Sequence, residues 1–233
     1  MPTCHVVRLD RIGYRAALDL QLRIVARMKA AEPRDAVLLL LEHPPVVTMG
    51  RSGEAANLRL PPRALAARGV EFHHTTRGGD VTYHGPGQIV GYPILRLPEE
   101  RRDVRRYLRS LEAVLIAALA RFGIAARREP GLTGVWTERG KVAAIGVAFT
   151  RWVAYHGFAL NVAPEMRHFG LIVPCGIDDR PVTSLEQLLG HAPPRREVED
   201  ALVEAFVQEF GYAEAREHAF VSRLSQELGG DPA

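Results

Sequence analysis

The sequence predicts an α+β (mixed α/β) fold: a single domain with a central mixed β-sheet flanked by helices. Stretches with helical apolar spacing stand near the start, in the middle and near the end of the chain, and strand-like segments lie between them. These elements lack the regular βαβ alternation of a parallel doubly wound sheet. The 233 residues, 47% of them hydrophobic, suffice for one sizeable core. We therefore expect one domain over residues 1–233, with its motifs at about residues 14–212.

The first predicted elements are a helix and two strands. Residues 14–30 carry apolar side chains at helical spacing and end before Pro33, which predicts an amphipathic helix. Residues 36–41, AVLLLL, are typical of a buried strand. Because proline cannot continue a central strand, Pro44-Pro45 separates this strand from a short second one.

The middle of the chain predicts strands around a glycine-rich loop, followed by a helix. Between residues 70 and 97 the segments VEFHHTT, DVTYH and QIVGYPILRL are β-rich, and glycines separate them. Residues 104–122 place apolar side chains on one helical face, and Gly123 follows where a C-cap glycine belongs.

Consecutive strands are predicted again over residues 134–162. A turn at residues 138–140 places Lys141 at the start of the second of these strands. Because side chains alternate along a strand, Lys141, Ala143 and Ile145 should share one face.

The periodic apolar pattern is weaker towards the two ends of the chain. Residues 198–210 predict a further helix, and the tail up to Ala233 is predicted to be helical and then frayed. One of the two cysteines, Cys4, stands near the N-terminus, where we expect fraying, and the other is Cys175. Two thiols so placed suggest no disulfide framework and fit a reducing compartment.

Composition and charge exclude several classes of protein. The formal net charge is +3, from 30 Lys+Arg and 27 Asp+Glu, which is far from the concentrated basic excess of a nucleic-acid binder. The longest apolar run, residues 36–41, is too short to cross a bilayer, and the first residues do not follow a signal-peptide pattern. We therefore expect a cytoplasmic protein that binds neither nucleic acid nor membrane, and we expect a monomer.

Cys175 and Lys141 are the candidate chemical groups. Cys175 lies in LIVPCGIDD, where an apolar run stops at proline and glycine, so a loop beside the core is expected. An isolated cysteine is more often a small buried hydrophobe, and from its own segment that reading is favoured. A nearby ammonium, however, stabilises a reactive thiolate. Lys141 is one of only two lysines, although most lysines after such a turn are simply solvated.

The glycine-rich segment RGGDVTYHGPGQ, residues 77–88, predicts a binding loop. A phosphate cradle, a nucleotide loop and a plain hairpin remain alternatives, but neither GxxxxGK[ST] nor a strand–helix GxGxxG is present. His73 and His74 are adjacent and point to opposite faces of a strand, so with His84 they do not predict a metal site. His43 and His156 are interpreted as structural histidines.

The order RGGDVTYHGPGQIVGYPIL, GVWTERGKVAAIGV, HGFALNV and PCGI, preceded by EHPPVVTMGR, resembles the lipoyl(octanoyl) transferases from about Tyr14 to Leu189. The resemblance implies the fold of the biotin/lipoate protein ligase catalytic domain. It also implies transfer of octanoate from octanoyl-acyl carrier protein to a lysine of a lipoyl domain, the first step of protein lipoylation. The implied acceptors are lipoyl domains of 2-oxoacid dehydrogenase complexes and the glycine cleavage H protein, and no cofactor is implied.

The resemblance also assigns residues. It implies that Cys175 forms the acyl thioester and that Lys141 tunes it. The residues that it implies for substrate binding come from the glycine-rich loop and from two strands: Arg77, Gly78, Gly79, Asp80, Val81, Thr82, Tyr83, His84, Ala144, Ile145, Gly146, Gly157, Phe158 and Ala159.

Several alternatives stay open. An ATP-dependent lipoate or biotin ligase of the same fold would not need Cys175, a catalytically silent module would only bind lipoyl domains or carrier protein, and a hydrolase would release the acyl group to water. The small residues of the two strands indicate either an acyl tunnel or tight sheet packing. Four arginines are a candidate surface for an acidic carrier protein, although charge runs usually just solvate a helix: Arg101, Arg102, Arg105 and Arg106.

Overall fold

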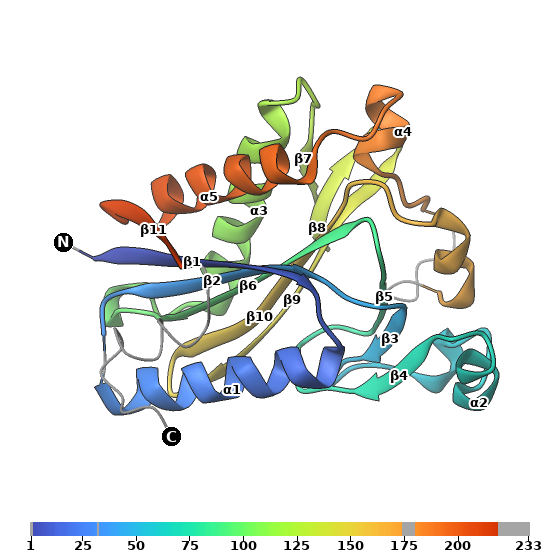
Figure 1. Cartoon of the computed structure of the whole chain (residues 1–233), viewed down its shortest axis with the longest axis horizontal. Coiled ribbons are helices and arrows are strands. Elements are labelled where there is room, and N and C mark those ends of the chain that lie inside the picture. The colour runs from blue at the N-terminus through green and yellow to red at the C-terminus, as the bar shows by residue number, and fades with distance from the viewer. Residues whose placement is uncertain (1, 32, 174–179, 219–233) are drawn as a thin grey trace.

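The computed structural model describes residues 2–31, 33–173 and 180–218. Its largest element is an eight-stranded mixed sheet of strand order β11-β1-β2-β6-β10-β9-β8-β7 (Figure 1). The strands of this sheet are β1 (Thr3–Arg11), β2 (Ala36–Glu42), β6 (Gln88–Arg96), β7 (Arg127–Glu129), β8 (Leu132–Thr137), β9 (Gly140–Thr150), β10 (Val153–Asn161) and β11 (Glu214–His218).

A small sheet and a set of helices complete the fold. The small sheet, of order β4-β3-β5, contains β3 (Val46–Met49), β4 (Glu71–His74) and β5 (Val81–His84). The helices are α1 (Tyr14–Ala31), α2 (Pro62–Ala66), α3 (Val104–Ala120), α4 (Leu185–Leu189) and α5 (Arg195–Phe210), and the 3-10 turns are η1 (Ala55–Asn57), η2 (Glu99–Arg101) and η3 (Met166–Leu171). The predicted fold class, a central mixed sheet flanked by helices, is confirmed.

The large sheet is buried on both faces. Figure 1 shows α1 along one face and α3 with α5 along the other. Along β2, Leu38 and Leu40 belong to the core beneath α3 and α5, whereas Leu39 and Leu41 belong to the core beneath α1. A strand covered on both faces needs apolar side chains at every position, which explains the run AVLLLL.

The helix predicted over residues 198–210 is confirmed as α5, but two other predictions near the ends of the chain are wrong. Cys4, expected near a frayed end, is fully buried in β1, and burial raises the pKa of its thiol to about 12. The start of the tail, expected to be helical, forms β11 in parallel register with β1. Pairing with β11 satisfies backbone groups that β1 would otherwise expose at the sheet edge. Residues 219–233, the rest of the predicted tail, lie outside the described residues.

The other predicted elements agree with the structure within a few residues. The helix predicted over residues 104–122 is α3, which Asp103 caps by accepting hydrogen bonds from the backbone N–H groups of Arg105 and Arg106 at 2.7 and 3.0 Å. Among the described helices, none is long and apolar enough to cross a membrane.

Candidate functional site

A narrow cavity of about 50 Å³ lies between the glycine-rich loop and strands β6, β9 and β10. Most residues predicted for the site line it, although they come from segments far apart in the sequence. The predicted residues in the lining are Arg77, Gly79, Asp80, Thr82, His84, Lys141, Ala144, Ile145, Gly146, Gly157, Phe158 and Ala159.

Three predicted residues do not line this cavity, and Cys175 lies outside the described residues. Val81 and Tyr83 alternate with Thr82 and His84 along β5, so their side chains join a separate apolar cluster behind the small sheet. Gly78 instead donates its N–H to the Val147 carbonyl at 2.8 Å and thereby fastens the loop to β9.

Sequence reasoning missed four residues of the lining: Tyr14, Val90, Tyr92 and His156. Val90 and Tyr92 lie within a strand whose sequence is typical of a hydrophobic core, and Tyr14 is the first residue of a helix. No sequence motif therefore marks these three residues as part of a binding site. The sequence predicts a structural role for His156, because a lone histidine is most often structural.

Lys141 is held at the cavity by its backbone. Its N–H donates to the Pro181 carbonyl at 2.9 Å, and its carbonyl accepts from the Thr183 N–H at 3.0 Å. Its ammonium lies 5.3 Å from the centroid of the Trp136 ring, and the residue is only 8% exposed. The alternative of a solvated turn lysine is therefore wrong.

The described segments on both sides of Cys175 are anchored near this site. Before it, Val173 donates its N–H to the Asn57 carbonyl at 2.8 Å. After it, Val182 forms a parallel bridge with Lys141. Cys175 follows Val173 by two residues and precedes Val182 by seven.

Asp80 connects the glycine-rich loop to this arrangement. One carboxylate oxygen accepts from the Glu54 N–H at 3.1 Å, and the other accepts from the side-chain amide of Asn57. Since Asn57 also receives the Val173 N–H, Asp80 is linked by hydrogen bonds to the segment that leads into Cys175.

Arg77 is a buried cation at the edge of the cavity. Its guanidinium donates to the Thr48 carbonyl at 2.6 Å and to the Thr48 hydroxyl at 2.9 Å, which ties the loop to β3. Gly146 faces this loop, and a Cβ placed there would come within 3.0 Å of the Gly78 carbonyl. Gly146 therefore serves the close approach of loop and strand.

Gly157 has a comparable packing role. A Cβ at Gly157 would lie 2.2 Å from the Gly91 carbonyl oxygen of the neighbouring strand β6. The small residues of these strands were expected to form either an acyl tunnel or a tightly packed sheet. Tight packing accounts for Gly146 and Gly157. Both glycines also line the cavity.

Three buried histidines around the cavity are neutral. Burial lowers the pKa of His43 to about 4, and burial together with the charge of Arg77 lowers the pKa of His156 to about 3. Burial, followed by His43 and Arg77, lowers the pKa of His84 well below its ordinary value. In the part of the chain that the structure describes, no group of three or more His, Cys, Asp or Glu side chains could hold a metal ion.

His43 and His156 are fixed by specific partners. The Nδ1 of His43 donates to the Ile12 carbonyl at 2.7 Å, so its Nε2 accepts from the Tyr92 hydroxyl, also at 2.7 Å. His156 has a φ of 58°, and its N–H donates to the buried Gln21 side chain at 2.8 Å. A left-handed histidine inside a strand is strained, and such strain is concentrated at functional sites.

The family model described as lipoyl protein ligase A/B catalytic domain matches residues 13–207. The chain belongs to the lipoyl protein ligase A/B catalytic domain family.

Two relatives are about half identical to the chain over the residues that align with it. An octanoyltransferase of Myxococcus xanthus is 47% identical over 216 residues, which are 90% of this chain and 60% of that protein. An octanoyltransferase of Solibacter usitatus is 50% identical over 188 residues, which are 81% of this chain and 84% of that protein. The chain thus spans less than two thirds of the Myxococcus protein but most of the Solibacter protein.

Solved structures agree with the family fold. The bipartite lipoate protein ligase of Thermoplasma acidophilum, studied with its E2 lipoyl domain, superposes with a TM-score of 0.77 at 16% identity. The match covers 98% of this chain and 92% of that one. At this identity the likeness shows the fold shared by lipoyl protein ligase A/B catalytic domains.

Proposed function

We infer that the chain is an octanoyltransferase of protein lipoylation. Relatives that carry this name are 47% and 50% identical over most of the chain. The observation that carries the inference further is the position of Lys141, which lines the cavity and is bridged to Val182, seven residues after Cys175. A buried lysine beside a cysteine-bearing segment suits acyl transfer through a thioester.

The proposed first half-reaction forms an acyl-enzyme. The Cys175 thiolate attacks the carbonyl carbon of octanoyl-acyl carrier protein, a new C–S bond forms, and the bond to the carrier sulfur breaks. Lys141 holds the proton that the thiol gives up and returns it to the departing carrier thiolate. Because the product is again a thioester, the step requires no ATP and no cofactor.

In the second half-reaction the neutral amine of a lipoyl-domain lysine attacks the acyl-Cys175 carbonyl. A C–N bond forms, the C–S bond breaks, and the proton lost by the amine passes through Lys141 to the Cys175 sulfur. The acceptors are proposed to be lipoyl domains of 2-oxoacid dehydrogenase complexes and the glycine cleavage H protein. We propose a cytoplasmic monomer that uses no metal.

The cavity suits a neutral acyl chain. Its walls combine small residues and Phe158 with histidines that stay uncharged. Each methylene that leaves water contributes about 0.8 kcal/mol to binding. We propose that Ala144, Ile145 and Ala159 contact the octanoyl chain and that Arg77 keeps the loop closed over it.

The function is tested by transfer of octanoyl from purified octanoyl-acyl carrier protein to a lipoyl domain without ATP. We expect an octanoylated lipoyl domain with wild-type enzyme and none with Cys175→Ser. Transfer that requires ATP and free octanoate would instead indicate a ligase. Octanoate release without modified lipoyl domain would indicate a hydrolase, and binding without either product a silent module.

A further inference from the structure

A second and larger cavity lies at the C-terminal end of β6. Its volume is about 530 Å³, within the range of roughly 300–1,000 Å³ typical of small-molecule sites. It meets Leu95 to Leu97, whereas the first cavity meets Val90 and Tyr92. Tyr92 and Leu95, the nearest lining residues of the two cavities on this strand, are about 10 Å apart along a strand that rises about 3.3 Å per residue. Among the residues that the structure describes, none lines both cavities.

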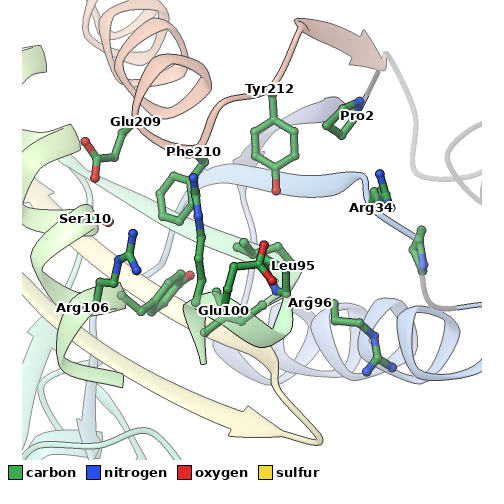
Figure 2. Close-up of a pocket in the computed structure, with 15 residues that line it drawn as sticks. Pro2, Arg34, Leu95, Arg96, Glu100, Arg106, Ser110, Glu209, Phe210 and Tyr212 are labelled. Atoms are coloured by element: carbon green, nitrogen blue, oxygen red, sulfur yellow. The ribbon is translucent and has the colours of Figure 1, made fainter. Parts of the chain in front are cut away.

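The walls of this cavity combine apolar surface with charge. Figure 2 shows Phe210, the last residue of α5, and Tyr212, which follows that helix, on one side, and Glu100 and Arg106 on the other. Buried Leu95 and Leu97 add aliphatic surface. A ligand here would therefore meet aromatic and aliphatic groups as well as charged ones.

Positive charge prevails among the lining side chains. In the described part of the chain, the charged residues of the lining are four arginines and two glutamates: Arg34, Arg96, Arg101, Arg106, Glu100 and Glu209. Arg96 donates to the Met28 and Arg151 carbonyls at 3.3 and 3.4 Å, so its guanidinium is already engaged. Within residues 2–31, 33–173 and 180–218, neither Arg34, Arg101 nor Arg106 forms an ion pair. Their guanidinium groups are therefore available to an anion.

Tyr107 lines the same cavity, and its side chain ends in a buried hydroxyl. Tyr107 is 2% exposed, and its hydroxyl has no hydrogen-bond partner within the described structure. The ring is held edge-on by Phe149 and Phe210, with centroids 5.3 and 5.8 Å away. Because buried hydroxyls are nearly always paired, an unpaired one beside a cavity indicates a missing partner.

We propose that this cavity binds a small anionic amphiphile, a molecule with one carboxylate, sulfonate or phosphate group on an apolar body. The anion pairs with Arg101 and Arg106, the body packs on Leu95, Leu97 and Phe210, and a polar atom of the ligand bonds the Tyr107 hydroxyl. This site is independent of the proposed octanoyl transfer.

The probe for the test is 8-anilinonaphthalene-1-sulfonate, whose fluorescence rises when its rings enter an apolar site. We expect saturable binding to the full chain, and at least tenfold weaker binding to Arg101→Glu/Arg106→Glu. The matched control is Arg102→Glu/Arg105→Glu, which makes the same charge change at neighbouring arginines that do not line the cavity. This control should bind as the wild type does.

Two comparisons measure separately how the anionic group of the ligand and the Tyr107 hydroxyl contribute to binding. The neutral N-phenyl-1-naphthylamine should bind at least tenfold more weakly than the sulfonate. Tyr107→Phe should weaken sulfonate binding by about threefold or more while leaving the thermal midpoint equal or higher, because it removes a buried unpaired group. A tyrosine with only a packing role would leave binding unchanged.

Competitors identify the anion. Displacement of the probe by octanoate assigns a carboxylate site, and displacement by phenyl phosphate assigns a phosphate site. The proposal is overturned if the wild type shows no saturable binding, if both double variants lose binding equally, or if the neutral probe binds as tightly as the sulfonate.

Discussion

Replacing Gly134 by alanine should displace the Lys141 side chain while both candidate catalytic residues, Cys175 and Lys141, are kept. Gly134 has a φ of +124°, and a Cβ there would lie 2.6 Å from Cε of Lys141 and 3.3 Å from its Nζ. The Ala143 carbonyl, at 2.7 Å, closes the other side, so the lysine side chain must move. Backbone strain of this kind costs about 1–3 kcal/mol, which is a fall of roughly 2–12 °C in the thermal midpoint.

The assay is steady-state octanoyl transfer to a lipoyl domain. A positioned acid–base group typically raises the rate of an enzymatic reaction by about 10²–10⁴-fold. Displacement of Lys141 should therefore lower kcat by about tenfold to a hundredfold, with little change in KM for the lipoyl domain. Gly131→Ala is the matched control, since Gly131 also has a positive φ of 77° but nothing within 4 Å of its Cβ. It should lose stability and keep kcat. Wild-type kcat in folded Gly134→Ala would refute a role for the observed Lys141 position.

Three further predictions concern the site. Asp80→Ala should lower kcat about tenfold by releasing the hydrogen bonds that lead to the Cys175 segment, and an unchanged rate would contradict this link. In the folded protein the pKa values of His43 and His156 are lowered to about 4 and 3. The free energy of unfolding should therefore be highest above about pH 6.5, the ordinary pKa of histidine. Below that pH it should fall by about 1.4 kcal/mol per pH unit for each histidine, until the pH reaches the folded-state pKa of that histidine. Urea unfolding checks this, and His156→Asn should flatten the slope; an unaltered slope would exclude His156. Ala144→Leu should shift the preferred acyl chain towards hexanoyl by roughly tenfold, since two methylenes contribute about 1.6 kcal/mol, and competition between acyl donors measures it.

The sequence predicts the secondary structure best where its pattern is long. The 3.6-residue spacing of α1, α3 and α5 and the apolar run of β2 are strong signals, and those elements appear as expected. The sequence does not predict β1 and β11, because both are mixed in polarity and β11 is short. Their parallel pairing joins residues more than 200 positions apart. Only the tertiary fold brings those partners together.

The residues of the candidate site, too, could be predicted only where the sequence has a recognisable pattern. The glycine-rich loop and the two small-residue strands have recognisable motifs, and their residues gather at one cavity. Tyr14 and Tyr92 carry no such signal, because an aromatic residue in a helix or strand normally reads as core. The strained backbone of His156 and the buried state of Lys141 follow from neighbours contributed by α1 and by residues 180–183, which local sequence cannot indicate.

The acyl-enzyme is the central claim, and mass spectrometry of the intact protein after mixing with octanoyl-acyl carrier protein tests it most directly. We predict one octanoyl adduct, mapped to Cys175, removed by hydroxylamine, absent in Cys175→Ala and discharged by an added lipoyl domain. A wild-type enzyme that transfers octanoyl while never carrying this adduct, or that carries it on another residue, would contradict the account.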